Sequence, residues 1–152
     1  MTIFRSLIIL TFLLPLLAAC GGGRSYNGPL QCAPYARKLT GVQLRGSAYT
    51  WWYKSQGKYL HTKQPKKGAI LVFRKTSKLP DGHVSVVKKI KDSRTIIVDH
   101  ANWDAQRINH NASVVDVSSR NDWSLVRVWW PPINKLGTRK YPTYGFILPG
   151  KT

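Results

Sequence analysis

Two runs rich in β-branched residues, separated by a short polar segment, constrain the fold of this chain more than any other feature. They lie in the stretch DGHVSVVKKIKDSRTIIVDHANW, residues 81–103. Such runs on either side of a polar turn predict an antiparallel β-hairpin. With Lys91 facing Arg94 across the turn, Val87 pairs with Val98, and the register of every other pair in the hairpin follows.

The register of this hairpin decides which polar side chains meet. Side chains alternate along a strand and opposed residues share a face, so His83, His100 and Asn102 point to one face and Asp99 points to the other. His83 and His100 are then diagonal neighbours whose side chains can meet. A turn one residue longer would bring Asp99 to the side of His83. We favour the register that joins the two histidines.

Two helices are predicted before the hairpin. Apolar residues follow Cys32 at helical spacing, Pro34 falls in the first turn, and Gly41 is a suitable end. A second helix is expected from a Ser47 cap to Gly57. The sequence thus predicts an α+β fold with N-terminal helices packed on an antiparallel sheet. The stretch from residue 137 onward, rich in Gly and Pro, is expected to be a loop lying over the domain.

The N-terminal residues have the layout of an export signal. Arg5 precedes an apolar run over residues 7–17, and LAAC follows at residues 17–20. The LAAC segment resembles the lipobox of bacterial lipoproteins, which implies a signal peptide over residues 1–19 and a lipid-modified Cys20 that anchors the protein in a membrane. Gly21, rather than Asp, follows the cysteine, as in Gram-negative lipoproteins that are sorted to the outer membrane, which this segment resembles. Residues 20–29 then form a tether, and residues 30–152 suffice for one domain.

The net charge and the type of acidic residue limit the partners and the enzyme classes that can be expected for this protein. The formal net charge is +18, which falls by one if Arg5 is removed with the signal, and such a charge favours polyanionic partners. Behind an export signal, the cell envelope is the expected partner. All six acidic residues are Asp, which argues against HExxH zinc peptidases and lysozyme-like enzymes. No Cys or His pair has metal-ligand spacing, so no metal or other cofactor is expected.

Cys32 is a thiol without an evident partner. Exported proteins usually keep cysteines in pairs, and Cys20 is assigned to the lipid. A remaining thiol is either reactive or a small buried apolar residue. At a helix N-terminus the macrodipole favours the thiolate, which points to a reactive role. A thiolate nucleophile needs a histidine base. His83 and His100 lie on the predicted sheet, whereas His61 and His110 are expected in loops.

The motifs QCAPYAR, PKKGAILVF, GHVSVV and IIVDHANW, in this order, resemble those of the CHAP domain (cysteine, histidine-dependent amidohydrolase/peptidase). The resemblance implies a papain-like core, a helix that carries Cys packed on an antiparallel sheet that carries His. It makes Cys32 the nucleophile and His83 the general base. The third polar position of the family, often Glu, falls on His100, and Asn102 matches an Asn of the family.

The resemblance also implies an activity. Family members cleave peptidoglycan, either at the amide that joins muramic acid to the stem peptide or within the peptide, through a thioester. The backbone N–H of Cys32 would stabilise the oxyanion with a donor from Gln31 or Tyr26, and Trp103 would form a groove wall. The implied protein is a monomeric, lipid-anchored hydrolase on the periplasmic face of the outer membrane.

Two other functions stay open at this point. One is a catalytically silent envelope-binding module with the same fold, which would use its charge to hold the wall. The other is a nucleic-acid-binding protein, which only the basic charge suggests and against which the export signal argues. No nucleic-acid partner is expected.

Overall fold

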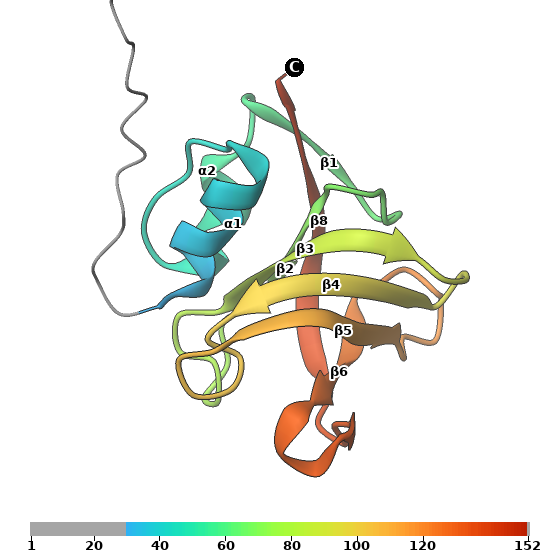
Figure 1. The fold of residues 1–152 in the computed structure, drawn as a ribbon. Helices are drawn as coiled ribbons and strands as arrows, with labels where there is room; N and C mark the ends of the chain where they lie inside the picture. The colour runs from blue at the N-terminus through green and yellow to red at the C-terminus, as the bar shows by residue number, and fades with distance from the viewer. Residues whose placement is uncertain (1–29, 152) are drawn as a thin grey trace, which may run out of the picture.

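The structure, a computed structural model, describes residues 30–151 and is mostly β-structure (Figure 1). Strands β2, β3, β4, β5, β6 and β8 pair in that order, and β8 pairs back onto β2, so six antiparallel strands close into a barrel. Strands β1 and β7 extend its edges. The strands are β1 Tyr59–Thr62, β2 Ile70–Phe73, β3 His83–Ile90, β4 Thr95–Ala101, β5 Ile108–Asp116, β6 Leu125–Trp130, β7 Lys135–Leu136 and β8 Tyr141–Lys151.

The prediction of an α+β fold with helices layered on a sheet is wrong, because the protein is a closed barrel with two short helices. The first helix was correctly predicted: α1 spans Cys32–Thr40 and ends at Gly41 in the left-handed region (φ 73°). The second is reduced to a 3-10 turn, Ala48–Thr50, and the single-turn helix α2, Trp51–Lys54. Ser47 does not cap it, since its hydroxyl donates to Asp81 Oδ1 at 2.8 Å.

The C-terminal residues form a strand, β8, where a loop was expected. Phe146 belongs to the apolar cluster inside the barrel, whereas Ile147 belongs to the cluster under the helices, so both faces of β8 are buried. Figure 1 shows β8 passing behind β3 and β4 to the side on which the helices lie. The sequence did not predict this strand, because Gly and Pro are uncommon inside strands. Gly145, at φ +127°, occupies the irregularity in the pairing of β8 with β2.

Replacing Gly145 by alanine is expected to lower the free energy of unfolding by roughly 1–3 kcal/mol, since the backbone conformation disfavours a side chain. A Cβ at Gly145 would also lie 2.8 Å from the backbone oxygen of Thr62. Denaturant unfolding followed by circular dichroism measures the change. Gly150→Ala is the matched control, because a Cβ at Gly150 meets nothing within 4 Å. Equal stabilities of the two variants would contradict the role of Gly145.

The hairpin of β3 and β4 has the predicted register at the end that carries the histidines. Val87 pairs with Val98 and Val86 with Asp99, as expected. A bulge between Val87 and Lys89 then shifts the pairing by one residue toward the turn. Both registers considered from the sequence therefore occur, separated by the bulge. The shift leaves the faces of His83 and His100 unchanged, because it lies beyond them on the turn side.

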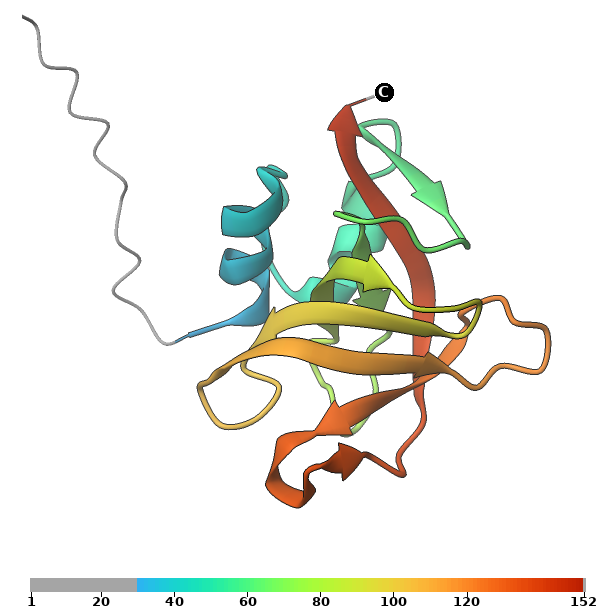
Figure 2. The ribbon, with the colours of Figure 1, turned by 45° about the vertical axis from the view of Figure 1, so that its right-hand side comes forward.

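The helices sit beside the end of the barrel where β3 begins and β4 ends (Figures 1 and 2). One apolar cluster fills the barrel and a second lies between the barrel and the helices. Within residues 30–151, no helix is long and apolar enough to cross a membrane. The predicted signal peptide, the lipidation of Cys20, the tether over residues 20–29 and the candidate donor Tyr26 lie outside the described residues.

Candidate active site

Cys32 is the first residue of α1 and lies against the start of β3. The preceding residue, Gln31, is extended, and no side chain caps the helix. The half-buried sulfur is a free thiol and is faced by the backbone N–H groups of Val84, Ala33 and Cys32 itself. Val84 directly follows His83 in β3, so the structure brings the thiol to the strand residue next to this histidine.

Gly82 allows the chain to enter β3 at this point. Its φ is +66°, and a Cβ there would lie 2.8 Å from the carbonyl oxygen of Phe73 and from the backbone of Tyr49. Only glycine fits such a close approach without displacing a neighbour. The Gly-His pair in the sequence therefore has a structural reason, since the glycine sets the path of the chain into His83.

His83 and His100 form a hydrogen-bonded pair at the rim of the barrel. Their side chains point to the same face, as predicted, and His83 Nε2 lies 3.1 Å from His100 Nδ1. Both are buried, with 3% and 1% of their surface exposed. Because Nε2 of His83 is engaged by His100, Nδ1 is the nitrogen left for the thiol. For Nδ1 to accept a proton, Nε2 must carry the hydrogen and donate it to His100 Nδ1.

Burial keeps both imidazoles neutral. It lowers the pKa of His83 well below 6.5, and the neighbouring His100 lowers it further. Burial also lowers the pKa of His100 to about 4, although Asp99 acts in the opposite direction. The pair therefore carries no charge near neutral pH, which suits a group that must first accept a proton.

The thiol pKa differs from the sequence-based expectation. Burial raises the pKa of Cys32 and outweighs the N–H groups of Val84, Ala33 and Cys32, which lower it. The expectation that the helix N-terminus favours the thiolate is therefore wrong in net direction, because desolvation disfavours the charged form more strongly. The resting site combines a neutral thiol with a neutral imidazole, so attack by the sulfur requires a proton to pass to His83.

The rate at which iodoacetamide alkylates Cys32 is expected to keep rising with pH up to the raised thiol pKa. No thiolate–imidazolium pair forms when the pKa of His83 is far below and that of Cys32 above its usual value. Mass spectrometry of the protein alkylated between about pH 4 and about pH 9 measures the profile, with free cysteine as the control. A plateau of high reactivity across the acidic range would reveal an ion pair and contradict this expectation.

Aromatic rings enclose the imidazole pair. The Trp103 ring stacks on His100 at 5.4 Å between centroids and lies 4.9 Å from the His83 ring. Phe73 contacts His83, and Tyr141 contacts Trp103. Three buried polar atoms nearby have no hydrogen-bond partner within residues 30–151: His100 Nε2, Trp103 Nε1 and Ser85 Oγ. This apolar enclosure lowers the local dielectric and strengthens the His83–His100 bond.

Asn102 does not join the histidines, contrary to its predicted pairing with His83. Strand β4 ends at Ala101, and Asn102 adopts a positive φ of 57°, which turns its side chain away. Its Nδ2 donates to Gln31 Oε1 at 3.3 Å, and its Oδ1 accepts two hydrogen bonds from Gln106. The amide of Asn102 therefore orients Gln31, and within residues 30–151 the Nε2 of Gln31 has no acceptor.

Asp99 lies on the opposite face of β4 from His100. It binds the backbone N–H of Asn111 at 2.9 Å, His110 at 3.1 Å and Lys88 at 3.3 Å. Burial would raise its pKa, but these three contacts outweigh burial and lower it. Asp99 is thus an ionised group that fastens β4 to β3 and β5. His110 belongs to β5 and His61 to β1, so the expectation that both lie in loops is wrong.

A cavity of about 300 Å³ opens beside the thiol, on the side of α1. It is bordered by Gln31, Cys32, Pro34, Arg37, Ser47 and Asp81. Most of these residues offer hydrogen-bonding groups. Sequence reasoning missed Ser47, Asp81 and Tyr141 as neighbours of the site, because nothing in their spacing connects them with Cys32 or His83. The Asp81 carboxylate also raises the pKa of the thiol.

The site combines a thiol at a helix start with a nearby histidine that a second side chain orients, and these are the kinds of group that nucleophilic catalysis by cysteine uses. The CHAP domain pattern matches residues 21–102, more than half of the 152-residue chain. The chain belongs to the CHAP domain family, which confirms the resemblance in the sequence.

No curated protein sequence matched the chain. Among solved structures, a similar chain is the N-acetylmuramoyl-L-alanine amidase from Staphylococcus aureus, with 21% identity and a TM-score of 0.49. The alignment covers 74% of this chain and 30% of that one.

Proposed function

We propose that the protein is a peptidoglycan hydrolase that cleaves an amide bond through a Cys32 thioester. One observation carries the proposal: in a CHAP family chain, the Cys32 sulfur meets the N–H of Val84, next to the hydrogen-bonded imidazoles of His83 and His100. The bond is either the amide between muramic acid and L-alanine or an amide within the stem peptide. The expected location is the cell envelope.

The first half of the reaction makes the thioester. The thiol of Cys32 transfers its proton to Nδ1 of His83 while the sulfur bonds to the amide carbonyl carbon. The imidazolium that forms is stabilised by its Nε2–H bond to His100. The backbone N–H of Cys32, which has no intrahelical acceptor at the first position of α1, and Nε2 of Gln31 donate to the oxyanion. The C–N bond then breaks, and the amine leaves with the proton from His83.

The second half releases the acyl product. A water molecule gives a proton to Nδ1 of His83 and attacks the thioester carbon. The C–S bond breaks, the proton returns to the sulfur, and the carboxylic acid leaves. His100 serves both halves by holding His83 in the tautomer whose Nδ1 can accept a proton. It is neutral and stabilises the imidazolium less than a carboxylate would, but its placement does not add a charge to an already buried site.

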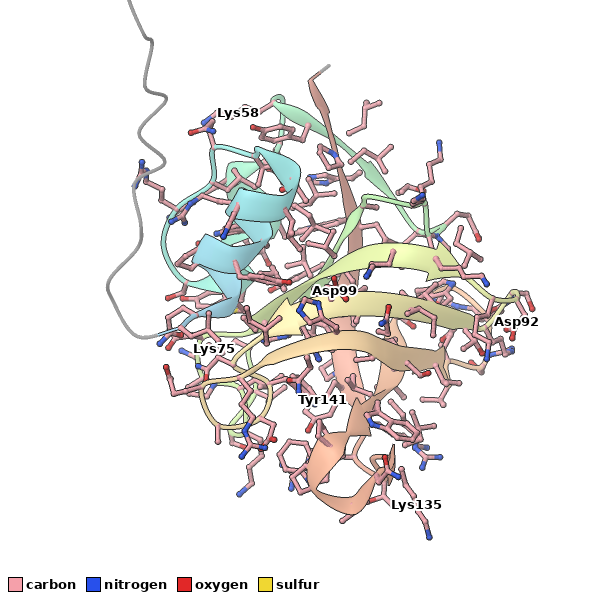
Figure 3. All side chains as sticks on the ribbon, in the orientation of Figure 1. Lys58, Lys75, Asp92, Asp99, Lys135 and Tyr141 are labelled. Atoms are coloured by element: carbon pink, nitrogen blue, oxygen red, sulfur yellow. The ribbon has the colours of Figure 1, made fainter. Side chains whose placement is uncertain are left out.

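The N-terminal residues extend the proposal to a location. A signal peptide over residues 1–19 and a lipid on Cys20 would hold the domain at the periplasmic face of the outer membrane, with residues 20–29 as the tether. The basic surface supports an anionic envelope partner. Figure 3 labels Lys58, Lys75 and Lys135 at widely separated positions, so these three basic side chains do not form a single patch.

Digestion of purified wall sacculi with the intact protein tests the proposed function. Mass spectrometry of the released fragments is expected to find either free L-alanine amino termini, from an amidase, or new termini inside the stem peptide, from an endopeptidase. Hydroxylamine added during turnover should intercept the thioester as a hydroxamate. Fragments cut only between sugars, or no soluble fragments at all, would contradict the proposal.

A further inference from the structure

A second cavity of about 300 Å³, with Trp103 as one of its walls, is not used in the proposed mechanism. It is formed largely by β6, the following hairpin and the start of β8, which lie outside the part of the chain that matches the family pattern. Figure 3 shows Tyr141 and Lys135 in this lower region of the molecule. Its walls include Trp103, Val128, Trp130, Ile133, Arg139 and Tyr141.

The cavity begins one aromatic ring away from the group that protonates the leaving amine. The Trp103 ring that forms its wall lies 4.9 Å from the His83 ring. In a cysteine hydrolase the acyl half of the substrate stays on the sulfur, while the amine half leaves from the side of the imidazole. The acyl half therefore lies toward the cavity beside Cys32, and the amine half extends past His83 toward Trp103.

The lining of this second cavity combines aromatic and aliphatic side chains with the hydroxyl groups of Thr138 and Tyr141 and one cation, Arg139. Arg139 is exposed and has no hydrogen bond or salt bridge within residues 30–151. The other arginines of the region are engaged: Arg127 donates to the carbonyl of Gly137, and Arg120 pairs with Asp122. Among residues 30–151, no carboxylate or amide side chain borders the cavity.

We propose that this cavity is the leaving-group subsite and binds an acidic peptide with small apolar side chains, whose free carboxylate pairs with the Arg139 guanidinium. The rings of Trp103, Trp130 and Tyr141 and the side chains of Val128 and Ile133 contact the apolar part, and Arg139 supplies the charge that a carboxylate needs. The inference rests on the proposed function, because that function gives His83 the role of proton donor to the amine half.

Binding of a free peptide to the Cys32→Ala protein tests the subsite without any turnover. The probe is L-alanyl-γ-D-glutamate, and the control ligand is the same peptide with both carboxylates amidated. Titration followed by calorimetry and by indole N–H signals of the tryptophans is expected to move the signals of Trp103 and Trp130. Arg139→Gln should weaken binding by about 3-fold to about 5-fold, the upper part of the range for an ion pair at an exposed side chain.

Lys140→Gln is the matched control, because it removes the same charge next to Arg139 but does not border the cavity. Lys140→Gln should change the affinity for the peptide by no more than about twofold. The amidated peptide should bind the protein with Arg139 more weakly than the free peptide does. The Arg139→Gln substitution should not weaken binding of the amidated peptide further. Equal losses of affinity in both variants, or NMR signals that move only beside Cys32, would overturn the subsite.

If the peptide binds here but sacculi are not cut, the proposed function fails and the subsite remains. If sacculi are cut but Arg139→Gln binds normally, only the subsite fails.

Discussion

Replacing Cys32 by alanine is expected to reduce the release of fragments from wall sacculi by about 10⁴-fold or more, since removal of a catalytic nucleophile leaves only residual catalysis. The sulfur is the only group in the described site that can form the thioester, and neither His83 nor His100 replaces it. Release of soluble muropeptides over time measures the loss. The fold should persist, because Cys32 is half-buried and its replacement removes a single atom from the edge of an apolar cluster.

Two further measurements make the Cys32→Ala result interpretable. Thermal unfolding of the variant should resemble that of the wild-type protein, which excludes loss of structure as the cause. A pull-down on sacculi should retain binding, because the basic surface is unchanged. Degradation by Cys32→Ala at the wild-type rate would refute the mechanism. Binding by both proteins without degradation by either would instead favour the envelope-binding module.

Replacing His100 by alanine is expected to lower kcat by about 10²-fold to about 10⁴-fold, the range found when the partner of a catalytic histidine is lost. Without His100, the Nε2–H of His83 has no acceptor and the ring loses its tautomer preference. The acid limb of the pH profile should also move to higher pH. Burial is the main cause that holds the pKa of His83 low. A smaller side chain at position 100 admits water beside the ring, and we expect this gain to outweigh the loss of the Nε2–H bond that stabilises the imidazolium. Steady-state kinetics across pH measures both changes.

Asp99→Asn is the matched variant for His100→Ala. It alters the adjacent residue of β4 but faces Asn111, His110 and Lys88 on the other side of the strand. It should reduce stability and leave the pH dependence of the rate unchanged. If Asp99→Asn shifts the pH profile and His100→Ala does not, the assignment of the third residue is wrong and Asp99 orients His83.

The helix start and the hairpin of the site could be predicted from the sequence because both depend on local patterns. Helical spacing after Cys32 and a glycine at position 41 define α1. Alternation of apolar and polar residues in the hairpin sets the faces of His83, His100 and Asp99, and a bulge nearer the turn does not change them. These features need no knowledge of the remaining chain.

The closed barrel could not be predicted because its closure depends on distant contacts. Strand β8 contains glycines and prolines that ordinarily interrupt strands. It is formed because Gly145 permits the irregular pairing with β2 and because both faces of the strand find apolar partners. The raised pKa of Cys32 could not be predicted from the sequence either, because it is caused by burial of the thiol in the folded protein. The turn at Asn102 likewise depends on contacts with Gln106 and Gln31.

The order of the strands has a consequence for how the protein is made. Strand β8 pairs with β1, β2 and β6, and it lies more than 60 residues after β1 and β2 in the sequence. Until the ribosome has released residues 141–151, β2 and β6 each lack a neighbour, and the core of the barrel is open to water. Contacts between such distant segments form late and slowly. A nascent chain that lacks β8 therefore has Cys32 without a complete barrel beside it, and we expect catalytic activity only after residues 141–151 have been translated.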